Sequence, residues 1–172
     1  EAKALHFASS ALRSDRDFVL AAVARDAHAL KFAAARLRDD RGFLLEAMRA
    51  NGGALAFAPK EFQLDHEVAL EALQAGEVAV KAIPQALRAD TAFMLQAARR
   101  CVGAVRVAPP SLRADRDFVL RAVAVDGRVV KYASEALHHD RGVALQAAAR
   151  SGGEALRLLP PEMRADPAVV RA

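Results

Sequence analysis

The chain has 172 residues, of which 53% are hydrophobic and 27% are charged, and its formal net charge is +4. This composition excludes a disordered chain, and so mild a charge does not by itself indicate a nucleic-acid partner. No apolar run is long enough for a transmembrane helix, and no signal-peptide pattern is present.

Aspartate and leucine recur every 25 residues. The aspartates are Asp15, Asp40, Asp65, Asp90, Asp115 and Asp140, and the leucines are Leu20, Leu45, Leu70, Leu95, Leu120 and Leu145. A fixed period of this length is typical of a small unit that is repeated and stacked. With Ala4 as position one, the repeats start near residues 4, 29, 54, 79, 104, 129 and 155, and one array covers residues 1–172. The seventh repeat is displaced by one residue and keeps its aspartate as Asp166.

The first helix of the repeat is predicted over roughly Leu5 to Leu12 in repeat one. Four repeats carry proline at position six: Pro59, Pro84, Pro109 and Pro160. Proline fits the first turn of a helix but not its interior, so we expect two pieces in these repeats, one of them a 3₁₀ turn. Where proline is absent, as over Ala29–Arg38, we expect one continuous helix.

The second helix is predicted to begin at the recurrent aspartate, whose carboxylate can accept the unpaired amides of the first turn. The predicted N-caps are Asp15, Asp40, Asp65, Asp90, Asp115, Asp140 and Asp166. In repeat one Phe18, Val19, Ala22 and Val23 follow with helical spacing. Helices this short are marginal alone, so each must pack against the next repeat. The sequence therefore predicts an all-α solenoid of about seven 25-residue two-helix repeats.

The repeat pattern A-L-x-F-A-x-x-x-L-R-x-D-R-x-F-V-L-x-A-V-x-x-x-G resembles the tandem helical repeats of the domain of unknown function 4116 family. The agreement is best at Leu12–Val23, Ala29–Ala50 and Leu112–Val123, and poorest at Ala79–Gly103. A weaker likeness is to leucine-rich-repeat variants, which pair an α-helix with a 3₁₀ helix. The resemblance implies a helical array and carries over neither catalytic residues nor a ligand.

Two columns of basic residues recur at positions three and ten. At position three we predict an interaction stripe of Lys31, Lys81, Arg106, Lys131 and Arg157. Such a stripe suits an acidic protein surface, anionic lipid or a phosphate backbone. Position ten holds Arg13, Arg38, Gln63, Arg88, Arg113, His138 and Arg164. We expect its arginines to pair with the aspartate of their own or the next repeat.

The motifs of common enzymes are absent: there is no G-x-S-x-G, H-E-x-x-H or C-x-x-C. The five histidines occupy different repeat positions and build no common metal site. The single cysteine, Cys101, excludes an internal disulfide and favours a reducing compartment, the cytoplasm or an organelle interior. We therefore predict a non-catalytic chain with no catalytic, cofactor-binding or metal-binding residues.

The preferred function is a protein-interaction scaffold, such as a peripheral or accessory subunit of a large assembly. Polar residues vary at positions eighteen, twenty-one and twenty-two, whereas the apolar core positions keep the 25-residue period. The first alternative is a nucleic-acid-binding array that uses the basic stripe. We expect most aromatic rings, at positions four and fifteen, to be buried, which argues against base stacking. The second alternative is a repeat region of a larger effector or enzyme, since the chain begins with Glu1 and ends within a repeat.

Overall fold

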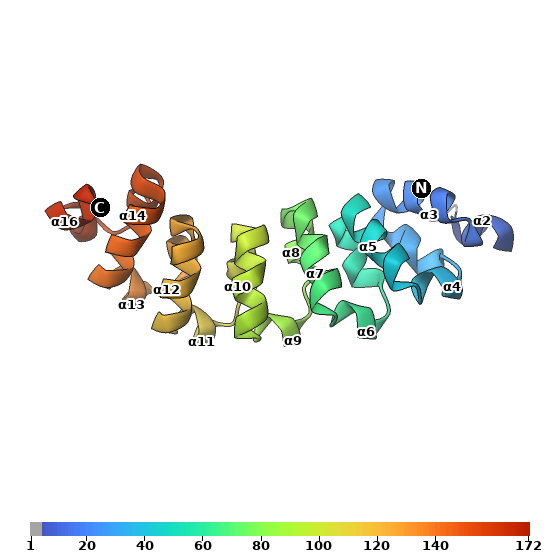
Figure 1. Ribbon diagram of the computed structural model, residues 1–172, viewed down its shortest axis with the longest axis horizontal. Coiled ribbons are helices and arrows are strands. Elements are labelled where there is room, and N and C mark those ends of the chain that lie inside the picture. The colour runs from blue at the N-terminus through green and yellow to red at the C-terminus, as the bar shows by residue number, and fades with distance from the viewer. Residues whose placement is uncertain (1–4) are drawn as a thin grey trace. The chain divides into compact units, whose positions relative to one another are not determined.

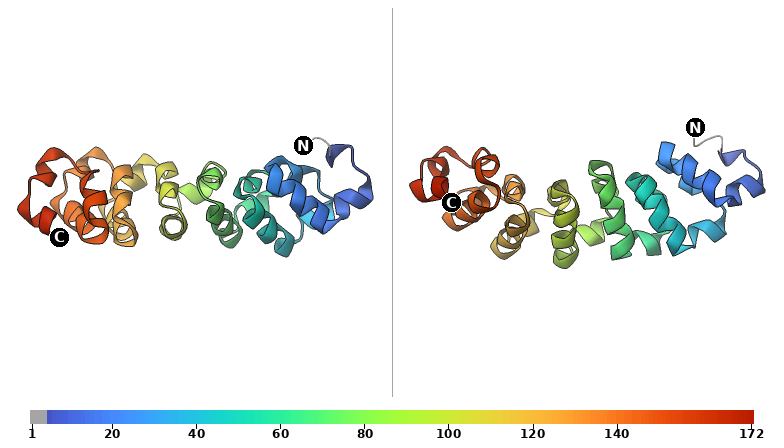
Figure 2. Two further views of the ribbon diagram at one scale, coloured as in Figure 1. Left: turned by 90° about the horizontal axis from the view of Figure 1, so that it is seen from above. Right: turned by 45° about the horizontal axis from the view of Figure 1, so that its top comes forward.

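The computed structural model describes residues 5–172, and within that range every regular element is helical. The chain divides into two compact units, and the division falls between Leu87 and Arg88. Within each unit, successive repeats stack on one another, and Figures 1 and 2 show this succession. The predicted all-α repeat solenoid is confirmed.

The long helices of successive repeats form one layer of each unit. In the first unit, α3 (Arg16–Arg25) packs on α5 (Arg41–Ala50), which packs on α7 (His66–Ala72). In the second unit, α10 (Thr91–Arg100), α12 (Arg116–Val125), α14 (Arg141–Leu156) and α16 (Pro167–Arg171) follow in the same way. Figure 1 shows α10, α12 and α14 side by side. This layer contains the largest buried side chains, among them Phe43, Phe93 and Phe118.

The second layer of each unit consists of short segments that follow the long helices. Most of them are six-residue 3₁₀ helices: η1 (Ala27–Phe32), η2 (Gly52–Phe57), η4 (Val102–Val107) and η5 (Gly127–Tyr132). After α7 the chain instead forms η3 (Leu73–Ala75) and α8 (Glu77–Val80), joined at Gly76, whose φ is 84°. Within the units, η1 packs on η2 and η4 packs on η5, so the second layer follows the same repeat order as the first.

A short α-helix then connects the two layers. These connecting helices are α2 (Ser10–Ser14), α4 (Ala35–Arg38), α6 (Lys60–Gln63), α9 (Gln85–Arg88), α11 (Pro110–Arg113), α13 (Glu135–His138) and α15 (Pro161–Arg164). A typical repeat thus contains three helical pieces rather than two.

The continuous helix expected over Ala29–Arg38 is wrong. The helix breaks at Ala33 and Ala34, whose ψ angles of 149° and 147° are extended, although no proline is present. The amide of Ala34 donates instead to the carbonyl of Arg13 in the preceding repeat, at 2.8 Å. Ser134 donates to Arg113 in the same way, at 2.9 Å. The break is therefore a property of the stack, because a backbone bond between repeats replaces the helical bond.

Candidate protein-interaction surface

Aspartate at position twelve is the N-cap of a helix in all seven repeats. Each carboxylate accepts an amide of the first turn; the bonds are 2.9 Å from Phe18 to Asp15 and 2.8 Å from Phe93 to Asp90. The other capping residues are Asp40, Asp65, Asp115, Asp140 and Asp166. These short helices gain a satisfied N-terminus, which contributes about 0.5–2 kcal/mol per cap.

In four repeats, an arginine at position thirteen bridges the repeat to the cap of the next. The four bridges are Arg16–Asp40 at 3.2 Å, Arg41–Asp65 at 3.0 Å, Arg116–Asp140 at 2.7 Å and Arg141–Asp166 at 2.6 Å. The prediction that position-ten arginines pair with these aspartates is wrong for Arg13, Arg38 and Arg113, for which the described part of the chain shows no such pair. Position thirteen is the first residue of the long helix, so its side chain reaches the cap beside it.

Exposed cations form the position-three stripe of each unit. Lys31 and Lys81 belong to the first unit, and Arg106, Lys131 and Arg157 to the second; all five are exposed. Within residues 5–172 no carboxylate pairs with Lys31, Lys131 or Arg157. The predicted stripe is thus accessible, and it lies on the 3₁₀ layer rather than beside the acidic caps.

A groove between repeats one and two gathers three cations of the first unit. It has a volume of about 310 Å³, and Arg13, Lys31 and Arg38 line it. The Nε atoms of Arg13 and Arg38 are buried without an acceptor among the described residues. Buried guanidinium nitrogens without acceptors are costly, so a carboxylate or phosphate entering this groove would be favoured.

The other position-ten side chains show how this part of the repeat is built. Gln63 donates to the carbonyl of Ala58 at 2.8 Å, and His138 Nε2 lies 2.7 Å from the carbonyl oxygen of Val130. Position ten thus folds back on the C-terminal end of the 3₁₀ segment in its own repeat. The carbonyl oxygen of Val130 also accepts the amide of Ala133 at 3.0 Å, and Ala58 is the C-cap of η2.

Repeats five and six carry two of the three cations at equivalent positions in the second unit. Arg113 and Lys131 occupy the positions of Arg13 and Lys31, and the Nε of Arg113 is also buried without an acceptor in the described range. His138 stands in place of Arg38, and Glu135 in place of Ala35. Because Glu135 adds a negative charge, the second cluster is less cationic than the first.

Comparison with known proteins identifies the family of the repeat. A family model described as Domain of unknown function (DUF4116) matches residues 2–38, 40–88, 90–138 and 115–164. These matches cover most of the sequence, and a full match spans about two 25-residue repeats. The chain belongs to this family. No curated protein and no solved structure matches it.

The DUF4116 repeats of this chain expose more aromatic surface than the sequence predicts. At position fifteen the expectation of burial holds for Phe43, Phe93 and Phe118, which are 0% exposed. At position four it is wrong, because Phe7 is 84% exposed and Phe32, Phe57 and Tyr132 are half-buried.

These position-four rings nevertheless have neighbours. His6 lies 5.1 Å from Phe32 and His28 lies 4.1 Å from Phe57, between ring centroids. Lys131 Nζ lies 4.7 Å from the centre of the Tyr132 ring. A nucleic-acid base would have to displace these groups before it could stack.

Two further findings concern the DUF4116 array as a whole. Among residues 5–172, no helix is both long and apolar enough to cross a bilayer. In the same range, no three His, Cys, Asp or Glu side chains gather in a way that could hold a metal ion. The candidate site is therefore the position-three stripe together with the groove lined by Arg13, Lys31 and Arg38.

We expect acid to destabilise the array. The bond from Arg41 lowers the pKa of Asp65, and Arg116 and Arg141 do the same for Asp140 and Asp166. A lowered folded-state pKa contributes stability above the unfolded value of about 3.9, and that stability is lost as pH falls through the folded value. Thermal unfolding between about pH 7 and pH 2.5 should show this fall. Arg41→Gln should reduce this loss of stability at low pH. An unchanged pH profile of unfolding in Arg41→Gln would contradict a stabilising role for the Arg41–Asp65 bridge.

Proposed function

We propose that the chain is a non-catalytic protein-interaction scaffold that binds acidic segments of partner proteins along its position-three stripe. The observation that carries this proposal is the groove in which Lys31 lies with Arg13 and Arg38, whose Nε atoms have no acceptor among the described residues. An extended acidic segment could place one carboxylate in this groove and others along the stripe. A role as an accessory subunit of a larger assembly is consistent with such binding.

The distribution of ion pairs supports the proposal. Four of the seven acidic caps are already engaged by position-thirteen arginines, for example Asp65 by Arg41. The cations of positions three and ten therefore have few acids near them, and their field attracts negative ligands. Arginine can also bind a carboxylate through two parallel hydrogen bonds, which adds geometric selectivity.

The surroundings of the aromatic rings favour a protein over a nucleic acid. A single-stranded nucleic acid gains about 1–3 kcal/mol per base from stacking on open rings. Here His28 lies against Phe57, and Lys131 lies over Tyr132. The charges remain available to a carboxylate, whereas a base at Phe57 or Tyr132 would meet a ring that already has a neighbour.

We expect an acidic peptide to bind the chain and to lose affinity when the groove loses charge. The probe is a fluorescein-labelled hexaglutamate peptide, measured by fluorescence anisotropy at low salt, with hexaglutamine as the neutral control. Arg13→Gln/Arg38→Gln should weaken binding by about 2–25-fold, since each exposed ion pair contributes about 0.2–1 kcal/mol. Glutamine occurs naturally at this position as Gln63, so the fold should tolerate both changes.

The matched control removes two positive charges elsewhere, at Lys60 and Arg121, both of which are exposed. Lys60→Gln/Arg121→Gln should leave the affinity within about twofold of the parent, because only the long-range field changes. Equal losses in the two double variants would reject the groove as the site. Tighter binding of a single-stranded oligonucleotide than of the peptide, with loss in the groove variant, would instead support the nucleic-acid alternative.

A further inference from the structure

Three separate elements bring cations to one small groove of the first unit. Arg13 comes from α2, Lys31 from η1 and Arg38 from α4. The groove has a volume of about 310 Å³, at the lower end of the range of about 300–1,000 Å³ for small-ligand pockets. It is therefore large enough for one side chain or small group of a partner, and too small for a whole segment.

No acid balances these three positive charges. Among residues 5–172, no Asp or Glu lines the groove, and no ion pair joins Arg13, Lys31 or Arg38 to a carboxylate. The Nε atoms of both arginines are buried without an acceptor in that range. Side chains at an interface commonly change rotamer on binding, so both Nε–H groups could turn toward a bound anion. The groove is thus short of negative charge and of hydrogen-bond acceptors.

The stack does not require these cations. At the junction between repeats two and three the corresponding positions hold Arg38, Ala56 and Gln63, so only one of the three is charged. Gln63 donates to the carbonyl of Ala58 there, and η1 still packs on η2. The three cations between repeats one and two therefore need a reason other than the packing of the repeats.

A phosphate monoester matches these groups better than a carboxylate does. At pH 7 it carries a charge of about −1.5 to −2 and three acceptor oxygens, whereas a carboxylate has one charge and two oxygens. Each of the three cations could bind one phosphate oxygen, and Ser10 and Ser14 line the same groove with hydroxyl donors. A phosphodiester, as in a nucleic-acid backbone, has only one charge and two free oxygens, so it would leave part of the positive charge unmatched.

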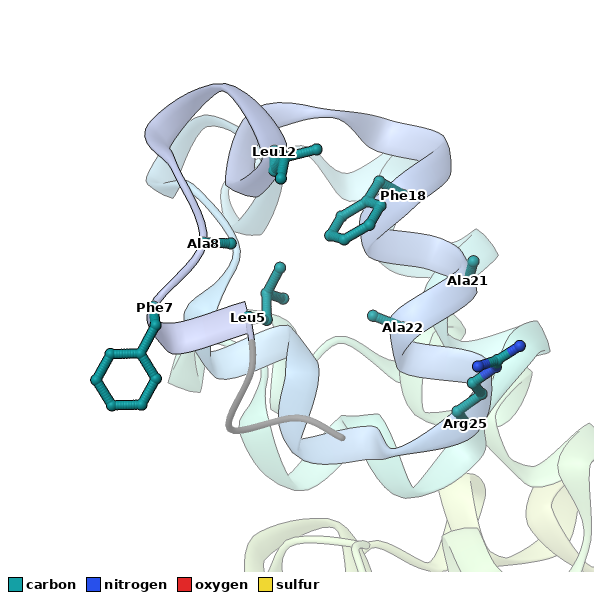
Figure 3. A pocket seen from close by; sticks show the side chains of 8 residues that line it. All are labelled: Leu5, Phe7, Ala8, Leu12, Phe18, Ala21, Ala22 and Arg25. Atoms are coloured by element: carbon teal, nitrogen blue, oxygen red, sulfur yellow. The ribbon is translucent and has the colours of Figure 1, made fainter.

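A second hollow of repeat one has a different chemistry. It has a volume of about 560 Å³, and Figure 3 shows Leu5, Leu12 and Phe18 around it with Arg25 at the rim. Arg25 is the only charged residue of the described chain that lines this hollow. One guanidinium beside apolar side chains cannot balance a dianion, so a phosphate monoester would favour the smaller, cationic groove.

We propose that the groove of Arg13, Lys31 and Arg38 binds a phosphorylated serine or threonine side chain within the acidic partner segment. The inference rests on the proposed function, because it names the group that enters the groove while the position-three stripe binds neighbouring carboxylates. The phosphate oxygens accept hydrogen bonds from the three cations. Phosphorylation of the partner then turns on tight binding, because an unmodified serine is neutral and leaves the three charges unmatched.

Two acidic peptides of matched charge test the preference for phosphate. One is fluorescein-labelled hexaglutamate, and the other has two glutamates on each side of one phosphoserine, so each carries about six negative charges on its side chains at pH 7.5. In fluorescence anisotropy we expect the phosphopeptide to bind more tightly by about tenfold or more. The same peptide with unmodified serine should bind more weakly than hexaglutamate. Because the charges are matched, long-range attraction does not account for the difference.

Variants of the groove should remove this preference. Arg13→Gln/Arg38→Gln should bring the two affinities to within about twofold of each other, because only Lys31 remains to bind phosphate. Lys31→Gln leaves both arginines in place and should lower the preference by about threefold. The matched control Lys60→Gln/Arg121→Gln removes two exposed charges elsewhere and should keep the preference of the parent. An unchanged preference in both groove variants would overturn the proposal.

The outcomes separate this inference from the proposed function. If the parent chain binds neither peptide, the proposed function fails and the inference fails with it. If hexaglutamate binds as tightly as the phosphopeptide, the phosphate site is overturned while the acidic-segment scaffold stands. Phosphatidylcholine vesicles that contain phosphatidate, whose headgroup is also a phosphate monoester, should not sediment with the chain. Co-sedimentation that is lost in Arg13→Gln/Arg38→Gln would assign the groove to a membrane and overturn the proposal.

Discussion

Replacing Phe43 by alanine should lower the free energy of unfolding by about 3–5 kcal/mol, the usual loss for a buried phenylalanine. Phe43 is 0% exposed and lies in α5, between α3 and α7. Its removal would leave a cavity between two repeats, and the stack has little freedom to close it because backbone bonds such as Ala34 to Arg13 fix the spacing. In a repeat array each interface contributes directly to stability, so this loss weakens the stack at that point.

Phe18→Ala is the matched control, because Phe18 holds the same repeat position in α3 but is 44% exposed. It should cost less than half as much as Phe43→Ala, since only part of its surface leaves water on folding. Urea unfolding followed by circular dichroism gives both values. Equal losses at the two positions would contradict the difference in burial between Phe18 and Phe43.

The period and the apolar spacing predicted the repeat architecture, because both are local properties of the sequence. The aspartate at position twelve followed by Phe or Val three residues later was enough to place each N-cap, as in Asp90 with Phe93. The break at Ala33 and Ala34 could not be predicted in this way. Alanine is the best helix former, and only the bond from Ala34 to the preceding repeat holds the chain extended there.

The candidate site was predictable in part for the same reason. Exposure of Lys31 and Lys131 follows from their place beside the apolar positions of the repeat. The groove does not follow, because it depends on how Arg13 and Arg38 from two different repeats approach Lys31. A usable indication was present in Gln63 and His138, which substitute for arginine with side chains suited to hydrogen bonding rather than to ion pairing. Those substitutions argue against an ion-pairing role for position ten.

Gly52→Ala should destabilise the first unit by about 1–3 kcal/mol, the usual loss from overpacking. A methyl group on Gly52 would overlap the carbonyl oxygen of Ala72 in the next repeat and approach the Cβ of Ala79 to 2.8 Å. The backbone oxygen cannot rotate away as a side chain can, so the two repeats would have to separate. Gly127, at the same repeat position, approaches the carbonyl oxygen of Ala147 in the same way, whereas Ala27 and Val102 occupy this position in other repeats.

Gly153→Ala is the control, since a Cβ there would meet nothing within 4 Å. It should be neutral or stabilising by up to about 1 kcal/mol, because alanine favours a helix more than glycine does. The midpoint temperature of thermal unfolding should therefore fall for Gly52→Ala, and it should stay the same or rise for Gly153→Ala. A Gly52→Ala chain as stable as the parent would show that the repeats can slide apart without loss. The contact between Gly52 and Ala72 would then not set their spacing.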